Sequence, residues 1–202
     1  MHRFYAPDIT TTMLLPDEEA QHCVRVLRLK EGEEVEVVDG KGHLHLCRIL
    51  NANAKNCAVE IVGTTDVKPH WGCRITVAIA PTKNMDRMEW MAEKVTEMGV
   101  DRIVPLLCRY SERKVLKTER LRKILVAAMK QSLKAYLPRV DSPMPLRELL
   151  ELPCAGSRLI AHCEESGNRT PLGEAFGPRE QVLILIAVSY THLRAHETTL
   201  HL

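Results

Sequence analysis

The chain has 202 residues, of which 45% are hydrophobic and 27% are charged, and its formal net charge is +2. This balance is typical of a globular protein and excludes an intrinsically disordered chain. The net charge is too small to indicate a nucleic-acid partner by itself. Any such argument therefore depends on where the charges gather along the chain.

The seven cysteines are spread singly, without a C-x-x-C pair, and their number is odd. This distribution argues against a disulfide framework and against a zinc ribbon, and it favours a reducing compartment. The first residues lack the basic and apolar regions of a signal peptide, and no segment approaches the roughly 20 apolar residues of a membrane span. We therefore expect a cytoplasmic protein.

The first seventy residues have the pattern of a small β unit that carries one helix. Pro16 and the three acids after it are typical of a first helical turn. Apolar residues from Ala20 to Leu27 then fall on one helical face, which leaves Arg25 and Arg28 on another. The run "EEVEVVDGKGHLHLCRIL" alternates on both sides of an Asp-Gly dipeptide and predicts a β-hairpin, and "CAVEIV" predicts a further strand.

Beyond a linker near residue 70 the pattern changes to alternating strands and helices. Strands are expected in "RITVAIA", "RIVPLLC", "RLIAHC" and "VLILIAV", and a short helix in "PLGEAF". One helix carries Met88, Met91 and Met98 as core residues and ends at Gly99. A second is expected to run from Thr118 through "KQSLKAYL". The fold class is therefore α/β with a mainly parallel sheet.

Sequence signatures of several common enzyme classes are absent. The chain contains no G-x-G-x-x-G, G-x-x-x-x-G-K-[ST], G-x-S-x-G or H-E-x-x-H, which argues against dinucleotide, P-loop, serine-hydrolase and zinc-protease sites. Ten basic residues instead lie between Arg109 and Arg139, against two acids. Such a cluster is typical of a surface that binds a polyanion such as RNA. Each of these residues taken alone, however, is as readily explained as ordinary exposed surface charge.

Two further candidates leave alternatives open. His43 and His45 share one face of an expected strand and have the spacing of a chelating pair, but no third ligand is nearby, so a solvent-facing pair is the favoured reading. Tyr110 precedes the basic loop, where it is either a stacking platform for a base or a rim residue.

Four motifs occur in order along the chain: "HCVRVLRLKEGEEVEVVDGKG", "APTKNMDRMEWMAEKVTEMGVDRIVPLLCRYSERKV", "AAMKQSLKAYLP" and "LIAHCEE". From Met1 to about Ile186 the chain resembles the RsmE family of bacterial ribosomal RNA methyltransferases, in the SPOUT class. The resemblance implies a PUA-like RNA-binding β-barrel over residues 1–70, a SPOUT-type α/β domain with a trefoil knot over residues 71–186, and a homodimer. It also implies methyl transfer from S-adenosyl-L-methionine to N3 of a uridine in 16S rRNA.

The resemblance and the basic cluster together give the expected site residues. RNA contacts are expected at Arg25, Arg28, Arg113, Lys114, Gln131, Ser132 and Lys134. The donor is expected near His162, Ile186 and Ala187, where His162 also has a reading as a structural histidine. This chain carries Lys130 and Lys134 where many members carry an acid and an arginine. No catalytic base is identified, and a lysine or arginine near the uracil oxygens would stabilise the developing anion.

In the family the last apolar strand runs into a G-P-E-G-G type loop that holds the donor. Here Ala187 stands where the first glycine is expected, and "AVSYTHLRAHETTLHL" follows. His192 and His196 have the spacing of a metal pair, but the break in register favours a non-native tail over residues 187–202, without metal. With the knot-closing segment missing, we expect this chain to bind the donor poorly or not at all and to be inactive for lack of the cofactor loop. The alternatives are a non-catalytic RNA-binding protein and a metal protein with a histidine tail.

Overall fold

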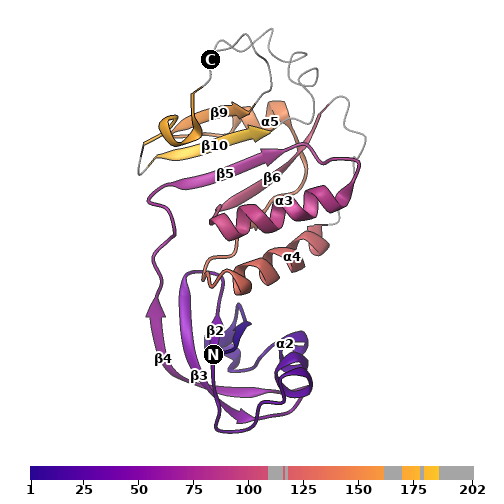
Figure 1. Ribbon diagram of the computed structural model, residues 1–202, viewed down its shortest axis with the longest axis vertical. Coiled ribbons are helices and arrows are strands. Elements are labelled where there is room, and N and C mark those ends of the chain that lie inside the picture. The colour runs from indigo at the N-terminus through magenta and orange to yellow at the C-terminus, as the bar shows by residue number, and fades with distance from the viewer. Residues whose placement is uncertain (109–115, 117, 162–169, 178–179, 187–202) are drawn as a thin grey trace. The chain divides into compact units, whose positions relative to one another are not determined.

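The computed structural model describes residues 1–108, 116, 118–161, 170–177 and 180–186. The basic loop with Tyr110, Arg113 and Lys114, the expected donor residue His162, and the stretch from Ala187 onward lie outside the described residues. The chain divides into two compact units (Figure 1). The first unit contains Met1–Pro69 together with Val126–Leu137, and the second contains His70–Leu125 together with the chain from Pro138 onward.

The first unit is built on a four-stranded sheet in the order β1-β2-β3-β4. Its strands are β1 (Arg3–Tyr5), β2 (Glu34–Val38), β3 (His43–Asn51) and β4 (Ala58–Asp66). The β1–β2 pair is parallel, whereas β2–β3 and β3–β4 are antiparallel. Leu14 forms a bridge with Ala58 on the other side of β4, so the chain after the first helix covers that edge.

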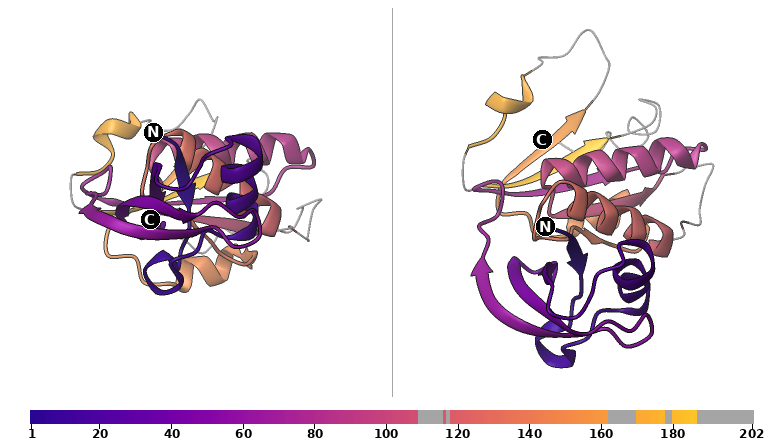
Figure 2. Two further views of the ribbon diagram at one scale, coloured as in Figure 1. Left: turned by 90° about the horizontal axis from the view of Figure 1, so that it is seen from below. Right: turned by 60° about the horizontal axis from the view of Figure 1, so that its bottom comes forward.

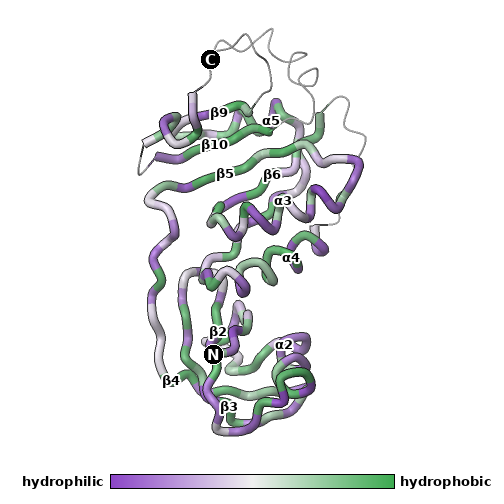
Figure 3. Tube along the Cα trace, viewed as in Figure 1, coloured by the Kyte–Doolittle hydropathy of each residue, from purple (hydrophilic) through white to green (hydrophobic). Residues whose placement is uncertain are grey.

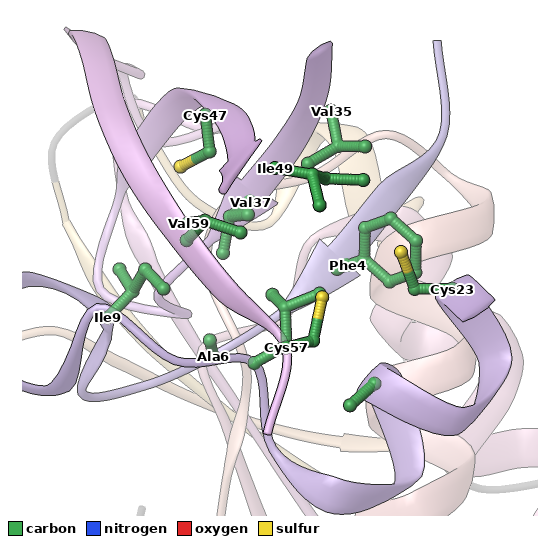
Figure 4. Packing of buried hydrophobic residues seen from close by; sticks show 12 residues of the cluster. Phe4, Ala6, Ile9, Cys23, Val35, Val37, Cys47, Ile49, Cys57 and Val59 are labelled. Carbon is green, nitrogen blue, oxygen red and sulfur yellow. The ribbon is translucent and has the colours of Figure 1, made fainter. Parts of the chain in front are cut away.

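Alternate strand residues point into one core, because successive side chains of a strand face opposite sides of the sheet. Phe4, Val35, Val37, Ile49 and Val59 are almost fully buried there (Figure 4). Burying a side chain of this size contributes roughly 1.5–3 kcal/mol. The short helix α1 (Ile9–Thr12) and the helical turns α2 (Asp17–Gln21) and η1 (His22–Val26) complete the unit.

The predicted hairpin between β2 and β3 is confirmed. One oxygen of the Asp39 carboxylate accepts hydrogen bonds from the backbone N–H groups of Lys41 and His43, at 2.7 and 3.1 Å. Gly40 and Gly42 have φ values of 77° and 109°, which L side chains rarely adopt. The Asp-Gly signal in the sequence therefore reports a real turn.

The second unit contains a parallel sheet in the order β7-β6-β5-β10-β9, and β8 pairs with the end of β6. Every strand pair of this sheet is parallel, as predicted. Its strands are β5 (Arg74–Ile79), β6 (Arg102–Leu107), β7 (Arg139–Val140), β8 (Met144–Pro145), β9 (Ser157–Ala161) and β10 (Gln181–Ile186).

The strands of this sheet are apolar along their length (Figure 3). Ala78, Val104, Leu106, Leu183 and Leu185 form a buried cluster, which packs against α5 (Leu146–Glu151), a helix that the sequence patterns did not predict. On the same strands the alternate residues are buried as well. Both faces of the sheet are therefore covered, which explains the continuous apolar runs. The predicted helix in "PLGEAF" is the shorter turn η2 (Leu172–Glu174).

Helix α3 (Met85–Met98) begins with the Asn84 side chain accepting a hydrogen bond from the Asp86 backbone N–H, and Gly99 ends it at φ 88°, as predicted. Met88 is buried, but the expectation that Met98 is a core residue is wrong. Met98 is 58% exposed because it lies in the last turn, beyond the part of the helix that covers the sheet.

Helix α4 (Thr118–Gln131) starts where predicted but ends earlier than expected. Its first turns lie beside α3 (Figures 1 and 2), where Arg120 forms an ion pair with Glu89 at 2.6 Å. Leu133 has a φ of 58°, and the Lys134 N–H donates to the Met129 carbonyl at 3.0 Å, which closes the last turn. The residues up to Leu137 then pair with the β2–β3 hairpin, so tertiary contacts override a sequence with good helix propensity.

Candidate nucleic-acid interface and ligand edge

The helix predicted after Pro16 is a regular helix that changes into a π-helical turn, η1. The Leu27 N–H donates to the His22 carbonyl, five residues earlier, at 3.0 Å. The single extra residue of a π turn shifts the side chains that follow it, and such turns are frequent at functional sites. The turn keeps Cys23 buried and leaves Arg25 exposed.

Arg25 and Arg28 are both exposed, and neither side chain forms an ion pair or hydrogen bond with another described residue. Val26, which lies between them, is 68% exposed. Arg28 has a φ of 55°, in the left-handed region that favours glycine. The turn therefore presents to solvent an apolar side chain and two guanidinium groups that no described residue pairs with, on a backbone that carries local strain.

Cys23 lies beside Phe4 and Cys57 in the core (Figure 4). A hydrogen bond with Cys57 and burial both raise the pKa of the Cys23 thiol, so it remains protonated at neutral pH. Six cysteines of the described part of the chain are free thiols. Cys23 thus packs the turn onto the sheet of the first unit as a protonated thiol.

The second predicted RNA segment follows the end of α4. Gln131 is exposed, and its side chain and that of Lys134 have no partner among the described residues. The Ser132 hydroxyl donates to the Ala128 carbonyl at 2.7 Å, which fixes its proton inside the last turn and leaves its oxygen as an acceptor.

Lys130 is not a free cation. Its Nζ donates to Oε1 of Glu19 at 2.5 Å, and the two side chains are only 21% and 10% exposed. Glu19 belongs to α2, directly before η1. The ion pair therefore brings the end of α4 next to the segment that carries Arg25 and Arg28. The two predicted RNA segments, about a hundred residues apart in sequence, are neighbours in the first unit.

Part of the predicted basic cluster is neutralised by acids from elsewhere in the chain. Besides Lys130, Arg120 pairs with Glu89 at 2.6 Å and Arg139 pairs with Asp141 at 2.8 Å. The sequence could not reveal Glu19 and Glu89, since they come from other elements, whereas Asp141 lies only two positions after Arg139. Glu19 in particular gave no local signal, because it lies 111 positions from Lys130.

The carboxyl edge of the parallel sheet has a topological switch point between β5 and β10. The chain runs from β5 outward to β6 and β7 on one side, and returns through β9 and β10 on the other. Ligands of open α/β sheets bind in the crevice beside such a point. Ile186 ends β10 there, and its carbonyl accepts a hydrogen bond from Ala80 at 3.3 Å. Of the three predicted donor residues, only Ile186 lies within the described chain.

The favoured reading of His43 and His45 as a solvent-facing pair is wrong for His45, which is 2% exposed. Its Nδ1 lies 2.9 Å from the Thr64 hydroxyl, and burial lowers its pKa. The His43 ring lies 2.6 Å from the Asp39 carboxylate, and this hydrogen bond raises the pKa of His43. Among the described residues, no group of three histidine, cysteine or acidic side chains could hold a metal ion.

No helix in the described part of the chain is both long enough and apolar enough to cross a membrane.

Comparison with known proteins identifies both parts of the chain. Residues 69–187 match the family described as RNA methyltransferase domain, and residues 15–62 match the one described as RNA methyltransferase PUA domain. Ribosomal RNA small subunit methyltransferase E of Aquifex aeolicus is 28% identical over 74% of this chain, and that of Bacillus subtilis is 24% identical over 78%. The chain spans 66% and 64% of the length of these two relatives.

Solved structures give the same result. A probable rRNA-methyltransferase from Porphyromonas gingivalis is 39% identical, with a TM-score of 0.88 over 98% of this chain and 86% of that one. Ribosomal RNA small subunit methyltransferase E from Neisseria gonorrhoeae, solved with S-adenosyl methionine, is 24% identical with a TM-score of 0.80, at the same coverage. At that identity the likeness concerns the fold, and together with the family models it confirms a PUA-like first part and an α/β RNA methyltransferase domain as the second part. The chain belongs to the RsmE family of ribosomal RNA methyltransferases.

Proposed function

We propose that this chain binds RNA and contributes to an S-adenosyl-L-methionine-dependent methyltransferase that acts on N3 of a uridine in 16S rRNA. The observation that carries the proposal is the Lys130–Glu19 ion pair at 2.5 Å, because it joins the two predicted RNA segments into one surface. On that surface Arg25, Arg28 and Lys134 have no acidic partner among the described residues. A polyanion would supply the missing negative charge.

The donor is proposed to bind at the carboxyl edge between β5 and β10. Pro81 is buried and Ile186 half-buried at this edge, and apolar groups of this kind suit the flat face of an adenine. Ile186 would hold the donor together with His162 and Ala187, which lie outside the described residues. When bound, the donor supplies an electrophilic methyl group on a positively charged sulfur.

The residues of the chain would then position the uridine and stabilise the charge that develops on it. N3 of uracil becomes nucleophilic only as its proton leaves, and negative charge then develops on the neighbouring oxygens. Arg113 and Lys114 are the proposed cations for that charge, and Gln131 and Ser132 the proposed hydrogen-bonding groups. Arg25 and Arg28 are proposed to hold the RNA backbone at a distance from the reacting base.

The test is transfer of a labelled methyl group from S-adenosyl-L-methionine to small-subunit rRNA transcribed in vitro. Because weak or absent donor binding is expected of this chain, the assay compares it with a form extended by the C-terminal segment of a relative. From the extended form we expect the label in 3-methyluridine after digestion to nucleosides, and none with rRNA purified from a bacterium that already carries the modification; this chain alone should transfer little or no label. RNA retention without any transfer by the extended form would instead identify a non-catalytic RNA-binding protein. Label in another nucleoside would contradict the proposed base. The proposal includes a homodimer, which sedimentation equilibrium tests.

A further inference from the structure

The stretch after α4 is held against the β2–β3 hairpin by the backbone (Figure 1). The Gly42 N–H donates to the Ala135 carbonyl at 3.1 Å, and the Leu137 N–H donates to the Gly40 carbonyl at 2.9 Å. Ala135 is buried in a small core with Val38 and Met129. Residues 132–137 are therefore fixed on the first unit, although their sequence follows a helix that starts in the second unit.

The Tyr136 side chain in this stretch is held in one orientation and is still partly exposed to solvent. A Cβ added to Gly42 would lie 2.4 Å from the Cζ and hydroxyl oxygen of Tyr136, so the ring occupies the space that a side chain there would need. Tyr136 also forms an antiparallel bridge with Lys41 and remains 38% exposed. The ring is thus oriented before any ligand binds, which lowers the entropy that a stacking contact costs.

Leu133 is an unusual residue for its position. It has a φ of 58° and is 67% exposed. A residue in the left-handed conformation after a helix is ordinarily glycine, sometimes asparagine, because a Cβ is strained there. A leucine so exposed adds little to the core, so the folded unit alone gives no reason for its side chain.

The charges around Leu133 and Tyr136 favour a nucleic-acid partner. Lys134 and Lys41 are the cations beside them, and among the described residues the Lys41 ammonium donates only to the Pro7 carbonyl, at 3.1 Å. The nearby carboxylate of Asp39 is buried and already accepts the two backbone hydrogen bonds of the turn. An apolar and aromatic surface next to uncompensated cations is the composition by which proteins bind unpaired nucleotides.

We propose that Leu133 and Tyr136 form the apolar contact for an unpaired nucleotide of the RNA, with Lys134 on its phosphate. The inference rests on the proposed function and adds a contact outside the residues expected from the family. The base or sugar packs on the leucine and the ring, whereas the ammonium neutralises backbone charge.

The test compares the full chain with its Leu133→Gly variant in binding to a fluorescent oligouridine of twelve nucleotides, by anisotropy across a range of KCl concentrations. We expect the variant to bind about tenfold more weakly with an unchanged salt dependence, because it loses an apolar contact and no charge. Lys134→Gln should instead lower the log–log salt slope by about 0.7 to 1. Tyr136→Phe should retain affinity and Tyr136→Ser should lose it.

Met13→Gly is the matched control, since Met13 is also an exposed apolar residue at positive φ in the first unit, at 52°. It should bind RNA like the parent. The inference would be overturned if the Leu133→Gly variant shows a cooperative thermal unfolding transition, and is therefore folded, but binds RNA as tightly as the parent. A variant that only weakens self-association in sedimentation would also overturn it, because a second copy would then be the occupant. If the parent chain does not bind RNA, the proposed function is contradicted as well.

Discussion

Arg28 combines an exposed guanidinium, which no residue in the described ranges pairs with, and a backbone conformation that a residue with a Cβ adopts only at a cost. A left-handed conformation costs an L residue roughly 1–2 kcal/mol, which is a noticeable part of the stability of a small domain. Its φ of 55° is imposed by the end of the π turn, where the Leu29 N–H reaches back to the Cys23 carbonyl at 3.1 Å. A binding role for the side chain would explain an arginine at a position where glycine would carry no strain.

Arg28→Gly and Arg28→Ala separate the backbone from the side chain. Both variants lose the guanidinium, so both should bind RNA several-fold more weakly than the parent. The glycine variant should be more stable than the alanine variant by about 0.5–1 kcal/mol, because relief of the left-handed strain exceeds the extra entropy of glycine in the unfolded chain. Urea unfolding and filter binding measure the two effects. A glycine variant that is less stable than the alanine variant would show that Arg28 is unstrained.

The raised pKa of His43 makes the free energy of unfolding depend on pH, with more stability at low pH than at high pH. The hydrogen bond with Asp39 raises the folded-state pKa of His43 above its ordinary value of 6.5. The pair therefore stabilises the fold fully below pH 6.5, and this contribution is lost as the pH rises through the raised pKa. His43→Gln should lower the urea midpoint at pH 5.5 and have a smaller effect at pH 8.5. A loss that grows with pH would contradict this assignment.

At the scale of elements, the Lys130–Glu19 contact ties α4 to α2. Both side chains are largely buried, so removing one partner leaves an uncompensated charge, whereas removing both is milder. In a double-mutant cycle of Lys130→Gln and Glu19→Gln we expect a coupling of about 1–3 kcal/mol in the free energy of unfolding. We also expect each single variant to weaken RNA binding, since it loosens the segment that carries Gln131 and Lys134. If the two single substitutions change the free energy of unfolding additively, the ion pair does not couple α4 to α2.

Gly156 marks a close approach between β9 and β10. A Cβ at this position would lie 1.9 Å from the Gln181 carbonyl oxygen, and a backbone atom cannot move aside as a flexible side chain would. Gly156→Ala should therefore destabilise the parallel sheet by about 1–3 kcal/mol. Gly173→Ala is the control, because nothing lies within 4 Å of its Cβ position. Similar unfolding midpoints for both variants would disprove the close approach.

The elements themselves could be predicted where their signals are local. The Asp-Gly turn, the parallel strands and the end of α3 at Gly99 all follow from neighbouring residues. The end of α4 could not be predicted, because "SLKAYL" has good helix propensity and is diverted by a hairpin about a hundred residues earlier. The buried state of His45 was missed for a similar reason, since its partner Thr64 lies on another strand.

At the scale of the whole molecule, a count of charges in the sequence overstated the free basic surface. Arg25 and Arg28 were expected to be exposed, and the structure confirms it. Lys130, Arg120 and Arg139 were counted with them, but each is paired with an acid. The acids of Lys130 and Arg120 belong to other elements, and that of Arg139 is Asp141, two positions away. The tertiary structure decides which cations remain available to bind RNA. The contribution of each cation can therefore be tested by substituting one residue at a time.

Arg120 and Arg122 form a matched pair for that test, because they lie two positions apart in α4. Arg120 is bound to Glu89 at 2.6 Å, whereas the exposed Arg122 has no ion pair within the part of the chain described. Arg122→Gln should lower the slope of log K against log salt for RNA binding by about 0.7 to 1, because one released counterion is lost. Arg120→Gln should leave the slope unchanged, since its charge is already neutralised. Equal slopes for both variants, each lower than the parent's, would mean that RNA displaces Glu89, and that the ion pairs of the folded chain do not decide which cations RNA contacts.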